Sequence, residues 1–301
     1  MEFIYQEEDK QRLDKYLPDK LDITRSQIKK LILSGQILVN DKAPTVHHWL
    51  KPGDKIFYQP KEVEEKNAEF PAEPKIVDEN NEFIVLEKPS NMLSHPTDKG
   101  EINTMADWVM QKFPQAQKIG EDPNRPSIVH RLDREVSGLM VIPLTQDSFD
   151  SLKRQFADRT VRKEYTALVH GQLINDQGEI NQPLERDKKT GLMKVQSGKE
   201  AGKIALTTYQ IIKRFVNYTL VKVQIKTGRM HQIRAHFYSI GHSIVGDKLY
   251  QTKDIRKKKK VLDQRIFLHC TFLKFKDLEG NWHEYKSPLP HLLDQFLNKL
   301  K

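Results

Sequence analysis

A segment rich in glutamate and proline divides the sequence into two parts. Over residues 61–75 the chain shows no apolar periodicity, and this composition is typical of a linker. We therefore predict a small domain over residues 1–60 and a large domain over residues 76–301. The large domain has ample chain for a hydrophobic core.

Composition excludes several classes of protein. The single cysteine, Cys270, can form no intramolecular disulfide and supplies no cluster of soft metal ligands, which excludes a disulfide scaffold and a structural zinc site. The acidic residues 1–8 do not resemble a signal peptide, and no run of about 18 apolar residues is present to cross a bilayer. We expect a cytoplasmic monomer that has no membrane partner.

The excess of positive charge is concentrated in one part of the chain. Lys and Arg number 50 against 41 Asp and Glu, a net charge of +9, and residues 201–280 alone hold 17 against 5. The other residues together are therefore slightly acidic. Localised basicity favours a polyanionic partner, although the basic run at residues 256–260 is typical of a solvated loop.

The small domain is predicted to contain a helix with an apolar and a basic face. Thr24 is a candidate N-cap, and Gly35 is expected to end the helix. The apolar side chains have helical spacing and are Ile28, Leu31 and Ile32. The basic side chains that fall away from them are Arg25, Lys29 and Lys30. Short strands are predicted at residues 37–39 and 55–58. Such a basic face suits a phosphate backbone, and it is equally typical of a solvated amphipathic helix.

The large domain alternates strand-like runs with shorter helical stretches. Strands are predicted over residues 83–86, 139–142, 164–169 and 218–225, and a helix over residues 148–157. Residues 218–225 alternate with period two, which is typical of a half-buried antiparallel strand. We predict an α+β domain built on a large mixed, mainly antiparallel sheet, preceded by the small N-terminal α/β domain.

Most common catalytic motifs are missing from the sequence. It contains no Gly-x-x-x-x-Gly-Lys-Ser/Thr phosphate loop, no Gly-x-Gly-x-x-Gly segment after a strand, no Gly-x-Ser-x-Gly elbow and no His-Glu-x-x-His pair. The remaining candidate is the polar segment 127–140, which lies between two strand-like runs, where catalytic side chains often occur. Its composition alone fits an ordinary turn better, with Asp133 and Ser137 satisfying backbone donors.

Residues 130–139, His-Arg-Leu-Asp-Arg-Glu-Val-Ser-Gly-Leu, resemble the signature of the RluA/RluD-type pseudouridine synthase family. Further blocks that resemble this family follow in the expected order and extend the resemblance over about residues 85–290: they lie at 87–89, 95–96, 162–169, 227–236 and 241–247. Val136 stands in place of the usual threonine, and Asn91 in place of the usual glycine. Asparagine tolerates left-handed backbone geometry, so the turn at Asn91 is expected to survive.

The small domain resembles the alpha-L RNA-binding domain first described in a ribosomal small-subunit protein. The similar segments cover nearly the whole domain and are residues 12–17, 24–32 and 35–40. Domains of this kind commonly occur at the N-terminus of RNA-modifying enzymes. The resemblance therefore implies RNA as the partner, with Arg25, Lys29 and Lys30 as candidate RNA-binding residues.

The family resemblance implies catalytic roles for three residues. Asp133 matches the family's carboxylate, which must be ionised close to the sugar and base to act as a nucleophile or electrostatic partner. Arg234 is implied as the guanidinium that keeps this carboxylate ionised, although the two residues lie about 100 positions apart. Tyr165 is implied to stack on the target uracil and is a candidate for a part in removing the C5 proton. Without the motif, a strand tyrosine at the edge of the core explains Tyr165 better.

Four further residues are expected to contact RNA or to close the pocket. Arg131 is implied to fill the gap that a flipped-out nucleotide leaves in the RNA. Arg229 and His231 are candidate phosphate-binding residues. Leu268 matches the position where the family closes the pocket with an aliphatic side chain, and an ordinary core position fits it nearly as well.

The expected function is isomerisation of uridine to pseudouridine in structured RNA. This reaction has no net redox change and no energy input, so we expect no cofactor and no metal. Large-subunit ribosomal RNA is the first candidate substrate, and transfer RNA is the alternative. A rival interpretation is a non-catalytic RNA-binding or ribosome-assembly factor. The set Asp133, Tyr165 and Arg234 argues against this rival, because binding alone needs no carboxylate in a phosphate-rich groove.

Overall fold

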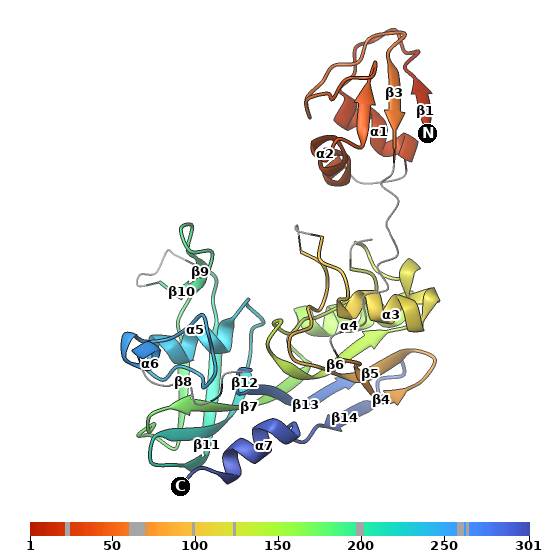
Figure 1. Ribbon diagram of the computed structural model, residues 1–301. Helices are drawn as coiled ribbons and strands as arrows, with labels where there is room; N and C mark the ends of the chain where they lie inside the picture. The colour runs from red at the N-terminus through yellow and green to blue at the C-terminus, as the bar shows by residue number, and fades with distance from the viewer. Residues whose placement is uncertain are drawn as a thin grey trace. The chain divides into compact units, whose positions relative to one another are not determined.

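A computed structural model of the chain describes residues 1–21, 25–59, 70, 72–97, 100–122, 125–196, 202–257, 262 and 265–301. The chain forms two compact units, Met1–Asn67 and Ala68–Lys301, which are described separately below (Figure 1). The candidate N-cap Thr24, most of the expected linker and residues 258–260 of the basic run lie outside the described residues. Strand β4 begins at Lys75, the last residue of the expected linker.

The small unit packs two helices against a three-stranded antiparallel sheet. Its elements are β1 (Glu2–Ile4), α1 (Leu13–Leu21), α2 (Arg25–Leu33), β2 (Ile37–Val39) and β3 (Lys55–Tyr58), with strand order β1-β3-β2. The strands expected at residues 37–39 and 55–58 are thus confirmed. Gly35 ends α2 with a φ of 73°, and the Gln36 N–H donates to the Leu31 carbonyl at 3.0 Å. A left-handed residue at a helix end is favourable only when no Cβ atom clashes with the backbone, which is why the glycine predicted the end of this helix.

The large unit is built on a nine-stranded sheet. Eight strands lie in the order β4-β5-β6-β13-β7-β12-β11-β8, and β14 also pairs with β13. Their bounds are β4 (Lys75–Glu79), β5 (Phe83–Lys88), β6 (Ser137–Pro143), β7 (Arg162–His170), β8 (Gln177–Asn181), β11 (Leu206–Arg214), β12 (Tyr218–Ile225), β13 (Leu268–Lys276) and β14 (Trp282–Lys286). Strands β6 and β13 are parallel, and the other pairs are antiparallel. The predicted mixed, mainly antiparallel sheet is confirmed.

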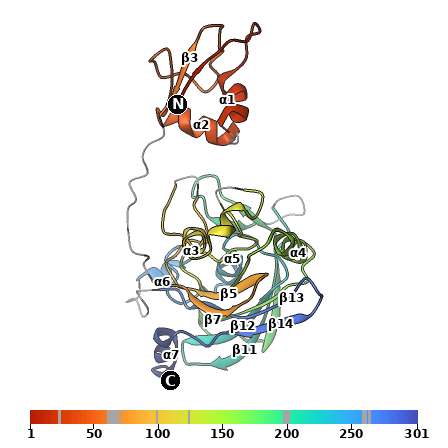
Figure 2. The ribbon, with the colours of Figure 1, turned by 90° about the vertical axis from the view of Figure 1, so that its right-hand side faces the viewer.

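Helices cover both faces of this sheet. The remaining elements are α3 (Met105–Lys112), η1 (Pro114–Lys118), α4 (Gln146–Ala157), α5 (Gln232–Ser239), α6 (Lys253–Lys257), α7 (His291–Asn298) and the hairpin of β9 (Leu184–Arg186) and β10 (Met193–Val195). Helices α3, α4 and α5 lie on one face, and α7 lies on the other (Figures 1 and 2). Helix α4 begins two residues before the predicted start. None of the helices among the described residues is long and apolar enough to span a membrane.

The expected alternation of β12 is wrong in the first half of the strand. Thr219, Leu220 and Val221 are all buried, because both faces of the sheet are covered there. Val221 belongs to the main core, whereas Leu220 packs in a second cluster with Leu293 of α7. The alternation of residues within β12 does not predict that α7 covers the second face of the sheet.

Strands β6 and β13 approach each other closely at Gly138. A Cβ added to this glycine would lie 2.4 Å from the Cys270 carbonyl oxygen, and its φ is 122°. We expect Gly138→Ala to lower the free energy of unfolding by about 3 kcal/mol. The alanine Cβ would clash with the Cys270 carbonyl, and alanine rarely adopts this φ. Urea denaturation measures the loss. Gly228→Ala is the control, since nothing lies within 4 Å of its Cβ position. Equal stability of the two variants would contradict the assigned role of Gly138.

Candidate active site

A cleft of about 880 Å³ opens on the large unit. Its lining brings together the residues that the sequence singled out in this unit: Arg131, Asp133, Tyr165, Arg229, His231, Arg234 and Leu268. They come from the loop before β6, from β7, from the segment after β12 and from the start of β13. Segments far apart in the sequence therefore form one site.

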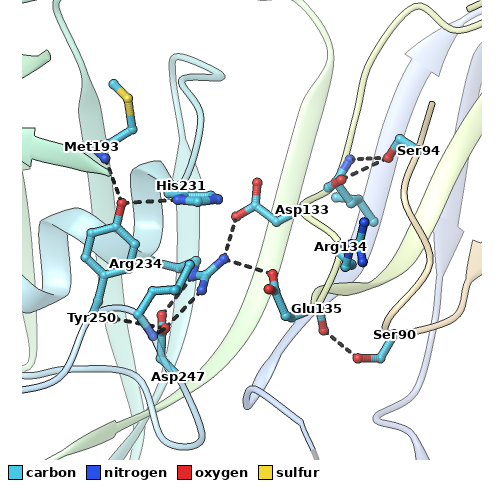
Figure 3. A network of polar contacts seen from close by, with 12 residues as sticks. Ser90, Ser94, Asp133, Arg134, Glu135, Met193, His231, Arg234, Asp247 and Tyr250 are labelled. Carbon is cyan, nitrogen blue, oxygen red and sulfur yellow. Dashed lines mark hydrogen bonds and ion pairs between the residues drawn. The ribbon is translucent and has the colours of Figure 1, made fainter. Parts of the chain in front are cut away.

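Asp133 faces a buried arginine in this cleft. The Asp133 Oδ2 atom lies 3.5 Å from the Arg234 Nη1 atom, with side chains 16% and 1% exposed, respectively (Figure 3). Asp133 is in the loop that precedes β6, and Arg234 is in the first turn of α5. The structure thus brings together the two residues that the family resemblance paired.

Two further carboxylates hold Arg234. Asp247, whose side chain is fully buried, accepts hydrogen bonds from Arg234 Nε at 2.7 Å and Nη2 at 2.9 Å. Glu135 accepts from Arg234 Nη1 at 3.0 Å, closer than Asp133. Burial alone would lower the pKa of Arg234, but the three carboxylates raise it above its usual value. The guanidinium therefore stays charged, and its position is fixed from two sides.

The loop after β5 holds the Asp133 loop in place. Ser94 Oγ donates to the Leu132 carbonyl at 2.9 Å and accepts from the Leu132 N–H at 3.1 Å. Ser90 Oγ donates to the Glu135 carbonyl at 2.6 Å (Figure 3). Asn91 lies between these serines with a φ of 67°, so the departure from glycine keeps the left-handed turn as expected.

Lys88, at the end of β5, connects the loop after β5 to the loop that carries Asp133. Its ammonium group donates to the carbonyl oxygens of Pro89 at 2.8 Å, Met92 at 2.7 Å and Arg134 at 3.3 Å. Burial lowers the pKa of Lys88 to about 7, against the opposing effect of Asp133 and Glu135. Lys88 lies in the block at residues 87–89 that resembles the family, but its residue type alone predicts no role for it.

Tyr165 and Leu268 lie on neighbouring strands in the wall of the cleft. Tyr165 is 4% exposed, and burial, together with the nearby Cys270 thiol and Asp133 carboxylate, raises its pKa well above the usual value. Tyr165 therefore keeps its phenolic proton. Leu268 both lines the cleft and belongs to the main core cluster, so its two interpretations are compatible.

The three basic candidates at the cleft differ in their environment. Arg131 is exposed, and its Nη1 atom lies 3.3 Å from His95 Nε2. Arg229 donates from Nε to the Ile204 carbonyl at 3.2 Å. His231 is the N-cap of α5, and its Nδ1 atom lies 3.1 Å from Tyr250 Oη. Burial lowers the pKa of His231, so it contributes a neutral ring rather than a positive charge.

Comparison with known proteins decides the family. The family described as RNA pseudouridylate synthase matches residues 82–239, more than half of the chain. The chain belongs to the RNA pseudouridine synthase family. An uncharacterised RNA pseudouridine synthase of Aquifex aeolicus is 36% identical over 94% of this chain and 92% of its own length. The ribosomal large subunit pseudouridine synthase D of Blochmanniella floridana is 31% identical over 96% and 94%, respectively.

A solved structure agrees with this assignment. The human RNA pseudouridylate synthase domain containing 1 protein superposes with a TM-score of 0.61 and 25% identity, over 74% of this chain and 87% of its own. The small unit matches the S4 domain over residues 11–56. This synthase is therefore of the RluA/RluD type, an isomerase that acts on uridine in RNA and carries an N-terminal S4 domain. Among the described residues, no group of three or more His, Cys, Asp or Glu could hold a metal ion.

The S4 domain of the synthase uses one of its candidate RNA-binding residues internally. Asp14 is fully buried and accepts from Arg12 Nε at 2.9 Å and from Arg25 Nε at 2.8 Å. Burial alone raises the pKa of Asp14, but the two guanidinium groups bring it below the usual value. Part of the positive charge of Arg25 is therefore neutralised by Asp14 and is not available to RNA. Lys29 is exposed, and the side chain of Lys30 lies outside the described residues.

A buried histidine supports the start of β6 in the synthase. His269 Nδ1 lies 2.7 Å from Ser137 Oγ, and His269 Nε2 lies 2.9 Å from Ser287 Oγ. Ser287 Oγ donates in turn to Glu87 Oε1 at 2.7 Å. Ser137 therefore uses its hydroxyl on a distant strand, and not on the local backbone donors that an ordinary turn would satisfy.

We expect this histidine to make the protein sensitive to acid. Burial lowers the pKa of His269 to about 4, whereas the unfolded chain has the ordinary value near 6.5. The unfolded state alone gains the proton between these values, so stability falls as the pH falls from about 6.5 to about 4, by about 2–3 kcal/mol. Urea denaturation at several pH values measures the slope. If His269→Gln loses the same stability over this window, another group is responsible.

Proposed function

We propose that the synthase converts uridine to pseudouridine in large-subunit ribosomal RNA, with Asp133 as the nucleophile. The observation that carries the catalytic part is the Asp133 carboxylate, which faces the buried Arg234 guanidinium at 3.5 Å in the cleft. The substrate part rests on a relative that is 31% identical over nearly the whole chain and is named for the ribosomal large subunit. Such an enzyme would act in the cytoplasm, as a monomer.

The arrangement suits a reaction that moves one bond. The N1–C1′ bond breaks, the uracil rotates while it stays in the cleft, and a C5–C1′ bond forms. The C5 proton is released, and N1 gains a proton. An ionised carboxylate is needed whether it attacks the sugar or the base, and it is released unchanged at the end. Arg234 places a buried positive charge 3.5 Å from this carboxylate, in a site that water only partly reaches.

The other cleft residues have roles that follow from their environments. Tyr165 keeps its proton and offers a flat ring next to Asp133, so we assign it stacking on the uracil. Arg131 is exposed at the cleft and is assigned to the gap in the RNA left by the flipped nucleotide. Arg229 and His231 are assigned to RNA contacts at the α5 side, and Leu268 to the pocket wall.

Tritium release tests the proposed substrate. RNA carrying tritium at C5 of uridine loses the label when pseudouridine forms. We expect release from large-subunit ribosomal RNA transcripts and none from small-subunit or transfer RNA. Release from transfer RNA alone would overturn the substrate assignment while leaving the reaction in place. Absence of release from every RNA would favour a non-catalytic RNA-binding factor.

The S4 domain is expected to supply part of the affinity for RNA. Removal of Met1–Asn67 should weaken binding and make its salt dependence shallower, because fewer phosphate contacts release counterions. The cut leaves Phe70, which packs against the core of the large unit. Binding titrations at several salt concentrations measure the slope, with the unfolding transition of the truncated protein as the control. An unchanged slope would remove the S4 domain from the RNA interface.

A further inference from the structure

A basic hairpin packs against the helix that carries Arg234. Strands β9 and β10 pair antiparallel, and the hairpin stands beside α5 (Figure 1). Its apolar side chains pack with Ala205, Ala235 and Tyr250, and they are Leu184, Leu192, Met193 and Val195. Its exposed basic side chains are Arg186, Lys188, Lys189 and Lys194. The ion pair between Lys194 and Asp187 leaves Lys188 and Lys189 as the cationic residues of the turn.

Tyr250 joins this hairpin to the start of α5. Its Oη atom accepts a hydrogen bond from the Met193 N–H at 2.9 Å and lies 3.1 Å from His231 Nδ1 (Figure 3). Burial raises the pKa of Tyr250 to about 12, so the hydroxyl keeps its proton and makes a neutral hydrogen bond with the His231 ring. One buried oxygen therefore holds a backbone group of β10 and the first residue of the α5 cap.

The same tyrosine also supports the guanidinium of Arg234. The Arg234 Cζ atom lies 5.4 Å from the centre of the Tyr250 ring, within the range of a cation–π contact. The Tyr250 N–H donates at 3.1 Å to Oδ1 of Asp247, the carboxylate that binds Arg234 through two hydrogen bonds. Tyr250 is 3% exposed, so these contacts have little freedom to adjust.

We infer that Tyr250 is a positioning residue that couples RNA binding at the β9–β10 hairpin to the placement of Arg234 against Asp133. The inference rests on the proposed catalytic role of Asp133. RNA bound at Lys188 and Lys189 restrains the hairpin, and the Met193 backbone then fixes Tyr250 Oη. The ring of Tyr250 lies against Arg234, which faces Asp133. Binding energy gained at the hairpin, away from the reacting atoms, is thereby used to hold Arg234 in position against Asp133.

The test compares kcat and KM in a set of four proteins on one RNA that the wild type modifies. They are the wild type, Tyr250→Phe, the double variant Lys188→Gln/Lys189→Gln, and the combination. Tyr250→Phe keeps the ring and loses both contacts of Oη, which should lower kcat by about five- to tenfold. In the wild-type background, the lysine changes should raise KM. They should also lower kcat by about threefold, since the hairpin no longer restrains Tyr250 and a free energy of about one weak hydrogen bond is lost. In the Tyr250→Phe background, the same changes should raise KM but leave kcat unaltered.

Two control variants lie away from this connection. Tyr285→Phe removes a hydroxyl that donates to Asp78 at 2.5 Å on the far part of the sheet, and Lys75→Gln removes an exposed charge from β4. Both should leave kcat unchanged. The lysines are exposed, so the double variant reports on the connection even if Tyr250→Phe folds poorly.

Three results would overturn the inference. They are a wild-type kcat in Tyr250→Phe, lysine changes that affect KM alone, and kcat losses that multiply in the combined protein as for independent sites. The proposed function fails on different results, namely no release from large-subunit RNA by the wild type, or full activity of Asp133→Asn. Because any RNA that the wild type modifies serves for the coupling test, the two failures are distinguishable.

Discussion

Asp133→Asn should lower kcat by at least about 10⁴-fold, the range seen when a nucleophile is removed from a preorganised site. Asparagine has almost the same shape as aspartate but neither its charge nor its nucleophilicity. The Asp133 side chain is 16% exposed and faces Arg234 at 3.5 Å, so the substitution leaves the core unchanged. Tritium release under single-turnover conditions measures the loss, and RNA affinity should stay within about threefold of wild type.

Glu135→Gln is the matched control for this experiment. Glu135 lies two residues from Asp133 and accepts from the same Arg234 Nη1 atom at 3.0 Å. If the reaction needed only a carboxylate next to Arg234, the two variants would lose activity alike. We expect less than about a tenfold loss from Glu135→Gln, since the glutamine oxygen can still accept from Arg234 Nη1 and only the negative charge of a partly exposed side chain is lost. A comparable loss in both variants would mean that Asp133 has no distinct chemical role.

Arg234→Met should be the most destabilising single substitution in the site. It removes the partner of Asp247, whose side chain is fully buried, and breaking a buried ion pair in this way costs about 3–5 kcal/mol. Activity should be lost as well, because Asp133 loses its neighbouring positive charge. Urea denaturation and tritium release on the same preparation measure the two effects.

A second substitution separates stability from catalysis. In Arg234→Met/Asp247→Asn the uncompensated charge is gone, while the asparagine oxygen can still accept from the Leu249 and Tyr250 N–H groups. We expect most of the stability to return and the activity to remain absent. Recovery of activity in the double variant would show that Arg234 acts only through the fold.

The sequence predicted the features that depend on local chemistry. Strands β2, β3 and β12 have the predicted bounds, because turn residues and apolar runs mark both ends of each. Gly35 and Asn91 adopt the left-handed conformations that their types suggested. The mixed sheet and the family were also predicted, the latter from motifs rather than from composition.

Other features depend on contacts between distant segments and could not be predicted. The residue types around Asp133 alone favoured an ordinary turn, and only the structure shows that Ser137 bonds to His269, 132 positions away. Asp247 lies in the block at residues 241–247 that resembles the family, yet nothing in the neighbouring sequence shows that its carboxylate is buried against Arg234. Glu135 also had no local signal, because it lies in a turn in which the Val136 N–H donates to the Asp133 carbonyl at 3.1 Å, and this turn brings both carboxylates to Arg234.

The order of strands has a consequence for how the enzyme matures during synthesis. Strand β13 lies between β6 and β7 and joins the half-sheet β4-β5-β6 to the half-sheet β7-β12-β11-β8. Asp133 lies in the loop before β6, the inner strand of the first half-sheet. Arg234 follows β12, which belongs to the second half-sheet. A growing chain is therefore expected to hold Asp133 and Arg234 on separate half-sheets until residues 268–276 have been translated. During that interval the inner edges of β6 and β7 are unpaired and open to association with other chains. We expect the late insertion of β13 to close these edges and to bring Asp133 and Arg234 together.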